Sequence, residues 1–166
     1  SPAEPFRQAL ILHEKAYSYV ELGQYELALS LFEQSMAVYQ QLNEPLWQSY
    51  SKVNMVWVNN LLKRYDAALQ LAEQAQAELT ANGNSDLSSA ATYQGLLALY
   101  HAETLIALNK AEQALEQLQI ADKQLEEIYW QYLPTVALEA TTTHPARNNE
   151  SAHPVGVPLS ASDRDF

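Results

Sequence analysis

Cysteine is missing from this chain, and glycine and basic residues are scarce. None of the 166 residues is cysteine, four are glycine, and 9 Lys and Arg stand against 20 Asp and Glu, for a formal net charge of −11. Without cysteine there is no disulfide framework, no thiolate nucleophile and no cysteine-ligated zinc or iron–sulfur site. The glycines are scattered, which excludes a glycine-rich loop that cradles phosphate. The acidic balance argues against nucleic acid and against an anionic membrane surface, because both bind clustered Lys and Arg.

Long apolar runs are also missing. No stretch approaches the roughly 20 apolar residues that cross a membrane, and the opening Ser-Pro-Ala-Glu-Pro has no basic region followed by an apolar one. We therefore expect a cytoplasmic protein with no membrane and no nucleic acid among its partners. Hydrophobic residues make up 48% of the chain, with abundant Leu and Ala, and this composition is typical of helices.

Proline divides the chain into a helical body and a tail. Residues 6–133 contain one proline, Pro45, whereas four of the seven prolines lie in 134–166. Proline removes a backbone donor and clashes with the preceding turn, so 134–166 is predicted to be a non-helical tail or linker. We expect one helical repeat domain over 1–133. Its helices should run over about 5–22, 25–42, 45–63, 65–80, 86–108 and 111–132.

Residues suited to helix ends separate these segments. Gly23 and Asn109 fit the left-handed position that ends a helix, and Asn82-Gly83-Asn84 should end the fourth helix. Asn43-Glu44-Pro45 is predicted to supply the cap, an acidic first-turn residue and an early proline for the third helix.

The six predicted helices repeat as three pairs, at about 6–42, 45–81 and 86–132. The segments 23–29, 63–69 and 109–115 can be overlaid, because each places an acidic residue two positions before an Ala-Leu pair. Small side chains let two helix backbones approach. We therefore expect Ala28, Ala68 and Ala114 to face the partner helix of their own pair. One pair cannot bury its apolar face alone, so the pairs must stack.

This pattern resembles the tetratricopeptide repeat (TPR) family over residues 6–132. The residues that carry the resemblance are Ala16, Gly23, Tyr25, Ala28, Phe32 and Ser35, then Tyr65, Ala68 and Ala75, then Ala102, Ala114 and Ala121. Two positions depart from the pattern, since Lys63 stands where the family prefers Gly and Ala111 where it prefers Tyr. The matching alanines are 40 and 46 residues apart, which is longer than the family's usual period of about 34. The resemblance implies an all-α, long-repeat TPR-like solenoid of three antiparallel helix pairs.

The resemblance also implies where a partner binds. In TPR stacks the first helix of each pair lines a concave face, and helical spacing assigns positions of this sequence to that face. The predicted groove residues are His13, Tyr17, Tyr50, Asn54, Trp57, Asn60, Leu96, Tyr100 and Glu103. One subclass of the family clamps a carboxylate with Lys, Arg and Asn on this face, and only Asn54 matches it, so no clamp is expected. An aromatic and apolar groove suits a partner peptide or amphipathic helix.

Packing between helices also produces an aromatic stripe at helical spacing. Tyr50, Trp57 and Tyr100 fit a packed core as well as a groove, and for the aliphatic positions the core is the favoured interpretation. His13 is interpreted as a polar surface residue in preference to a ligand or a pH switch.

No catalytic constellation is assembled in the sequence. His13-Glu14-Lys15-Ala16-Tyr17 begins like the zinc-protease helix motif, but Tyr17 replaces the second histidine ligand. His144 and His153 lie in the predicted tail, where no rigid scaffold holds a metal or a base. We expect no enzyme, no catalytic residue, no metal and no cofactor.

The sequence therefore predicts a protein–protein interaction scaffold or adaptor. A related hypothesis makes it the regulatory part of a larger bacterial signalling or protease-type protein. The alternative is a structural module that forms a homo-oligomer through its terminal helices. Two features stay open. The acids of the last helix either keep the chain soluble or dock a basic partner, and Pro154–Leu159 is either part of a linker or a segment that docks in the groove.

Overall fold

The computed structural model describes residues 1–81 and 87–126 of the chain. Five helices are α1 (Ala3–Glu21), α2 (Tyr25–Gln41), α3 (Pro45–Leu61), α4 (Tyr65–Ala81) and α5 (Leu87–Ala107). A further helix, here the sixth helix, covers residues 111–126. Over these residues the predicted all-α class and helical repeat are confirmed, and the ends of α1–α5 agree with the prediction within two residues. The predicted turn at 82–84, the end of the sixth helix near 132 and the tail at 134–166 lie outside the described residues.

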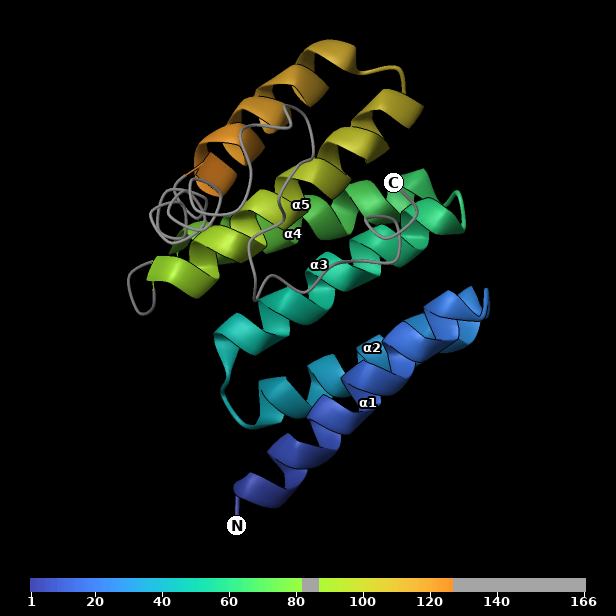
Figure 1. Cartoon of the computed structure of the whole chain (residues 1–166), viewed down its shortest axis with the longest axis vertical. Helices are drawn as coiled ribbons and strands as arrows, with labels where there is room; N and C mark the ends of the chain where they lie inside the picture. Colours follow the sequence, from blue (N-terminus) through green and yellow to red (C-terminus); the bar gives the residue numbers. More distant parts are fainter. Residues whose placement is uncertain (82–86, 127–166) are drawn as a thin grey trace, which may run out of the picture.

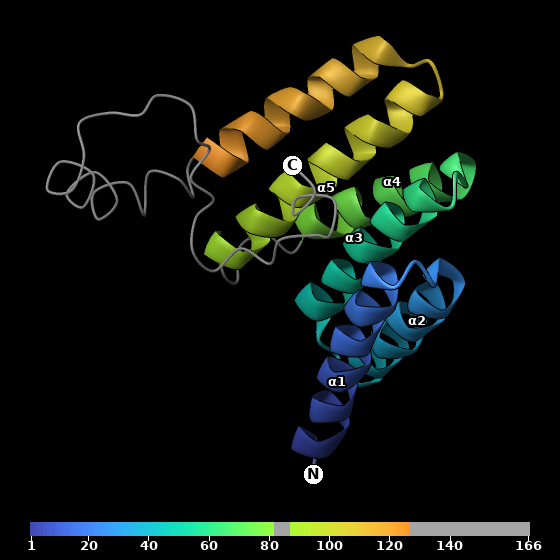
Figure 2. The ribbon, with the colours of Figure 1, turned by 45° about the vertical axis from the view of Figure 1, so that its right-hand side comes forward.

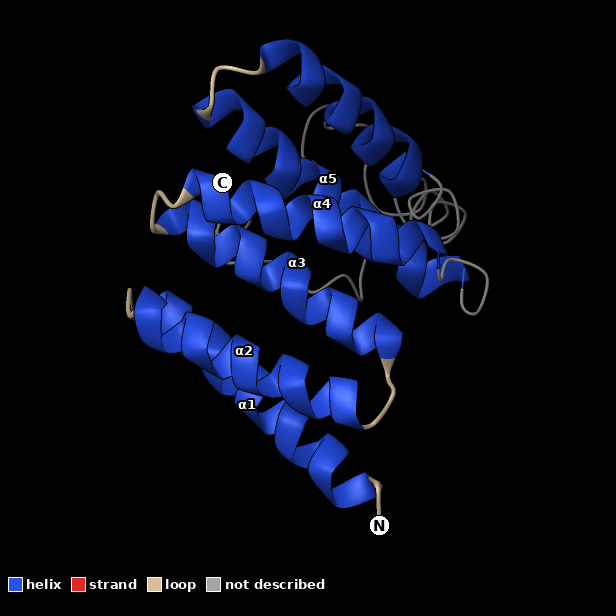
Figure 3. Cartoon of the chain, turned by 180° about the vertical axis from the view of Figure 1, so that it is seen from behind, coloured by secondary structure: helices blue, strands red, loops and turns tan. Residues whose placement is uncertain are grey.

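The helices are stacked in the order in which they occur in the chain. Each of α1–α4 packs on the helix that follows it, and α3 also packs on α5. Figure 1 shows α1 and α2 at the N-terminal end of the stack, α3 and α4 in the middle, and α5 with the sixth helix at the other end. Figure 2 shows the same three pairs from a second direction, and Figure 3 shows them from behind. The first helices of the pairs, α1, α3 and α5, therefore occupy equivalent places in the stack.

Four turns end their helices in the same way. A left-handed residue follows each helix: Gly23 (φ 72°), Asn43 (φ 56°), Lys63 (φ 59°) and Asn109 (φ 58°). In the first turn, the amide of Gln24 donates to the carbonyl of Tyr19 at 2.8 Å, and the other three turns repeat this bond. These bonds use carbonyl groups that the helix end would leave without partners. The left-handed roles predicted for Gly23 and Asn109 are confirmed.

The prediction for the turn before α3 was wrong in two respects, the cap and the acidic first-turn residue. Asn43 is the left-handed residue that ends α2, and it does not cap α3. Glu44 occupies the N-cap position of α3 without a capping side-chain hydrogen bond, and Pro45 is the first helical residue, as predicted. Asn suits both an N-cap and a left-handed position, so the sequence could not separate the two roles.

Lys63 has a left-handed backbone conformation that is unfavourable for lysine. A left-handed conformation costs a residue with a β-carbon roughly 1–2 kcal/mol, and the greater freedom of glycine in the unfolded chain offsets part of any gain. We expect Lys63→Gly to raise the free energy of unfolding by about 0.5–1 kcal/mol, measured by urea denaturation. Asn43→Gly is the matched control with a smaller gain, because Asn tolerates the conformation. A lower stability for Lys63→Gly would contradict the assignment.

Small residues hold the pairs together. Ala28 and Ala68 are fully buried in a core that runs from α1 to α5, and Ala114 is buried in a second cluster with Ala102 and Leu105 of α5. Gly95 lets α5 approach the sixth helix, because a β-carbon at this position would lie 2.9 Å from Leu125 Cδ2. The three repeat alanines, which were predicted to face the partner helix of their own pair, are all buried.

Candidate partner-binding site

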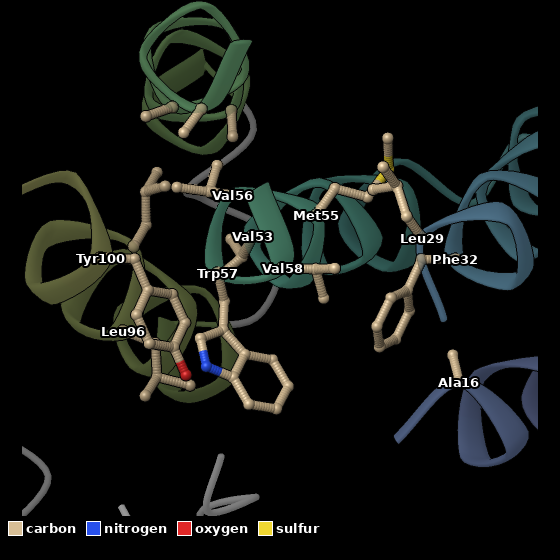
Figure 4. Close-up of a cluster of buried hydrophobic side chains, with 14 of the residues drawn as sticks. Ala16, Leu29, Phe32, Val53, Met55, Val56, Trp57, Val58, Leu96 and Tyr100 are labelled. Carbon is tan, nitrogen blue, oxygen red and sulfur yellow. The ribbon is translucent and has the colours of Figure 1, made fainter. Parts of the chain in front are cut away.

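An aromatic layer lies along α1, α3 and α5, and all but one of its residues were predicted to line the concave face. Its members are His13, Tyr17, Tyr50, Trp57, Tyr93 and Tyr100. Their rings form a chain of contacts across the three units. The ring of His13 stacks on Tyr50 with centroids 4.9 Å apart, and Tyr50 stacks on Tyr93 at 4.4 Å. Trp57 lies 6.1 Å from Tyr17 and stacks on Tyr100 at 6.2 Å. Figure 4 shows the Trp57 and Tyr100 rings side by side within the buried apolar cluster.

Asn54 connects the polar atoms of the layer. The Tyr17 hydroxyl donates to Asn54 Oδ1 at 2.9 Å, so the 2.6 Å bond between the Tyr17 and Tyr50 hydroxyls must use the proton of Tyr50. Asn54 Nδ2 donates to the Tyr50 carbonyl at 3.0 Å and lies 3.2 Å from His13 Nε2. Since Nδ2 can only donate, His13 Nε2 accepts and its ring proton is on Nδ1. This network fixes four side chains from two units.

His13 is buried, so its interpretation as a polar surface residue was wrong. The side chain is 3% exposed and lies against Tyr17, Phe32 and Tyr50. Removal from water lowers the pKa of His13 to about 4, because burial disfavours the charged imidazolium. The same physical cause raises the pKa of Tyr17 well above its ordinary value. At neutral pH the aromatic layer is therefore uncharged at both positions.

A second set of polar contacts joins α3 to α5. Asn60 Nδ2 donates to the Tyr100 carbonyl at 3.0 Å. The Thr104 hydroxyl lies 2.7 Å from Asn60 Oδ1 and 2.9 Å from the Tyr100 carbonyl, and it can donate to either oxygen. Asn60 thereby fixes the register of two first helices in neighbouring units.

The structure places the nine predicted groove residues at different depths. Most are buried: His13, Tyr50, Asn54, Trp57, Asn60, Leu96 and Tyr100. Tyr17 is half-buried and Glu103 is exposed. Glu103 follows Tyr100 by one turn of α5, and partial loss of solvent raises the pKa of its carboxyl group. The layer and its polar contacts bring together seven of the nine, while Leu96 belongs to the apolar core.

Sequence reasoning missed two members of this region. Tyr93 is half-buried and stacks on Tyr50, and Thr104 bonds to Asn60. Tyr93 precedes Tyr100 by seven residues, which places both on one face of α5. The helical spacing used for the other positions would have found Tyr93 had it been extended by one turn.

Two buried nitrogens of the layer lack hydrogen-bond partners within the part of the chain that the structure describes. They are Trp57 Nε1 and His13 Nδ1. The indole nitrogen is only a donor, and leaving a buried donor unsatisfied costs about 1–3 kcal/mol. A ligand atom that accepts from Trp57 Nε1 would recover part of that cost.

Lys52 lies two positions after Tyr50 of the layer, but its charge is paired with a residue of another helix. Its ammonium group forms an ion pair with Glu78 of α4, to which the Ser49 hydroxyl also donates at 3.3 Å. Among residues 1–81 and 87–126, no three His, Asp or Glu side chains gather in a way that could hold a metal ion. No described helix is long and apolar enough to cross a membrane.

Comparison with known proteins adds one finding to this geometry. Residues 7–81, which include most of α1 and all of α2, α3 and α4, match the family model described as tetratricopeptide repeat. Comparisons with curated proteins and with solved structures gave no match.

Proposed function

We propose that this chain binds a peptide or amphipathic helix of a partner protein on its aromatic layer. Residues 7–81 belong to the tetratricopeptide repeat family. The repeats of this family generally mediate protein–protein interaction and are typically not catalytic. The observation that carries the proposal is the preorganisation of that layer. Asn54 accepts a hydrogen bond from the Tyr17 hydroxyl, and Asn60 donates to the backbone carbonyl of Tyr100, so both residues fix the helices that carry the rings. Side chains that are already fixed lose little entropy when a partner binds.

The accessible part of this face has a definite chemistry. Tyr17 and Tyr93 are half-buried and Glu103 is exposed, while Trp57 is buried beneath the surface. Aromatic anchors of this kind favour apolar side chains of a partner. The carboxylate of Glu103 favours a basic residue beside them.

The test of this proposal is a binding measurement with variants of the accessible residues. A peptide library selects ligands of the full chain, and Kd is then measured for the wild type, Tyr93→Ala and Glu103→Lys. We expect Tyr93→Ala to weaken binding about tenfold or more, as for an aromatic hot spot. Leu27→Ala is the matched control, because Leu27 is an exposed apolar residue of α2, outside the layer.

Unchanged affinity in both Tyr93→Ala and Glu103→Lys would contradict this binding face. Circular dichroism of each variant separates loss of binding from loss of fold. Substitution of Trp57 is unsuitable here, because Trp57 is buried and its loss would also change stability.

Three hypotheses extend beyond the binding face itself. Docking of Pro154–Leu159 in the groove concerns residues outside the described ranges. A cytoplasmic location and a place in a larger bacterial signalling or protease-type protein stay predictions from the sequence.

A further inference from the structure

The exposed large apolar side chains of the described residues lie in the two end units. Ile11, Leu22 and Leu27 belong to the first unit, and Ile106, Leu115 and Leu118 belong to the third. None of those exposed in the described part of the chain belongs to the middle unit. Exposed apolar residues confined to the ends of a stack point to surfaces on which further units could pack.

The repeat register shows what the outer face of the third unit is suited to contact. Leu115 and Leu118 stand in the sixth helix where Leu29 and Phe32 stand in α2. Leu29 and Phe32 are buried in the core, where the Phe32 ring contacts His13 and Tyr17 of its own unit, and α2 packs on α3 of the next unit. Leu115 is 61% exposed and Leu118 is 38% exposed. At Leu115 the third unit therefore exposes the position that the first unit buries beside the next helix.

Ile106 of α5 extends this face in the same way. Its position in α5 corresponds to that of Asn60 in α3. Asn60 donates a hydrogen bond to the carbonyl of Tyr100 in the following first helix. Ile106 is exposed, and its apolar side chain cannot form the hydrogen bond that Asn60 forms. We call Ile106, Leu115 and Leu118 the trailing face. By repeat register, the trailing face corresponds to a surface on which the first helix of the next unit packs.

The opposite end of the stack carries a helix of the required kind. α1 is a first helix, and Ile11, Lys15, Ser18 and Leu22 stand where α3 places Ser51, Met55, Val58 and Leu62. In α3, Met55 lies beside Leu29 of α2, as Figure 4 shows. In α1 the matching residues are exposed, and they are spaced four, three and four apart along one helix face. We call these four residues the leading ridge.

We propose that copies of this chain associate head to tail, with the leading ridge of one copy seated on the trailing face of the next. The arrangement repeats the contact between α2 and α3, with Lys15 taking the place of Met55 over Leu115. The methylene stem of a lysine can cover an apolar residue while its charge reaches solvent. Glu112 lies one turn from Leu115, and Asp122 lies one turn from Leu118. Both carry a charge opposite to that of Lys15. Such an interface joins two different surfaces, and it can continue from copy to copy.

The decisive experiment is a complementation test by sedimentation velocity on the full chain. The wild type is expected to show a mass above one chain that rises with protein concentration. Leu115→Glu keeps the leading ridge and loses the trailing face, whereas Ile11→Glu does the reverse. Each variant alone is expected to stay a monomer. An equal mixture of the two is expected to form a 1:1 dimer that grows no further, because each supplies the surface that the other lacks.

Leu27→Glu is the matched control, since Leu27 is an exposed apolar residue of the first unit outside the leading ridge. It is expected to associate like the wild type, and circular dichroism checks that all three variants fold. A wild type that stays a monomer at every concentration would overturn the proposal. So would association that persists in Leu115→Glu or Ile11→Glu alone, or a mixture that fails to pair. Peptide binding at Tyr93 is expected to be unchanged in these variants, so the outcome is independent of the proposed function.

Discussion

Replacing Trp57 by alanine is expected to lower the free energy of unfolding by about 3–5 kcal/mol, the usual range for deleting a large buried aromatic side chain. Trp57 is 1% exposed and belongs to the core cluster that runs from α1 to α5. Its ring contacts Tyr17 of the first unit and Tyr100 of the third. An alanine at this position leaves a cavity where all three units meet, and the surrounding helices can close it only in part.

Two comparison variants make this prediction specific. Trp57→Phe keeps an aromatic ring and removes the buried Nε1–H, which has no partner within the described residues. We expect a much smaller loss than for alanine, because removing an unsatisfied donor offsets part of the lost packing. Leu22→Ala, at a residue that is 68% exposed, is expected to change stability by no more than about 0.5 kcal/mol. Urea denaturation followed by circular dichroism at a helix wavelength measures all three.

A loss below about 1 kcal/mol for Trp57→Ala would mean that the ring contributes little to packing. That result would assign Trp57 to partner contact alone, which is the other interpretation that the aromatic stripe allows. The sequence could not choose between the two, because both need aromatic residues at helical spacing on α1, α3 and α5.

The helix pattern could be predicted closely because its causes are local. Apolar periodicity defined the six segments, and residues such as Gly23 and Pro45 marked where helices end and begin. The conformation of residues without such a preference was harder to predict. Lys63 takes a left-handed conformation because the turn geometry recurs at every helix end, and no property of lysine indicates it.

The environment of His13 could not be predicted because its causes are distant in sequence. Its burial depends on Tyr50 and Asn54, 37 and 41 positions away, which reach it only when α3 packs beside α1. The periodic pattern placed His13 on the inner face of its helix, but it carried no information on what would cover it. The same limit applies to Asn54, whose amide group forms its hydrogen bonds within the chain and is not presented to a partner.

Acidification is expected to destabilise the fold through His13, by on the order of 3 kcal/mol between pH 6.5 and pH 4. The pKa of His13 is 6.5 in the unfolded chain and about 4 in the folded chain. Between these values the unfolded state binds a proton and the folded state does not, so stability falls as pH falls. The contribution of neutral His13 is complete above pH 6.5 and is lost as pH falls through the folded pKa.

The control for this prediction is a variant that keeps the polar contact without the titration. His13→Gln offers an amide oxygen to Asn54 Nδ2 and cannot be protonated in this range. Stability is measured by urea denaturation across the pH range for both proteins, and the difference between the two curves isolates His13 from the carboxylates that they share. His101 also has a lowered pKa from burial, and both proteins retain it. Two parallel curves would contradict the prediction.

Protonation of His13 also has a structural consequence that the same variant can test. The added proton turns Nε2 from an acceptor into a donor, facing Asn54 Nδ2, which is itself a donor. Asn54 must then rotate, and the bond from the Tyr17 hydroxyl to Oδ1 is broken. We therefore expect the aromatic layer of the wild type to loosen before global unfolding as pH falls. Tyrosine near-ultraviolet circular dichroism should show this change in the wild type and not in His13→Gln, because only the wild type carries the group whose charge disrupts the network.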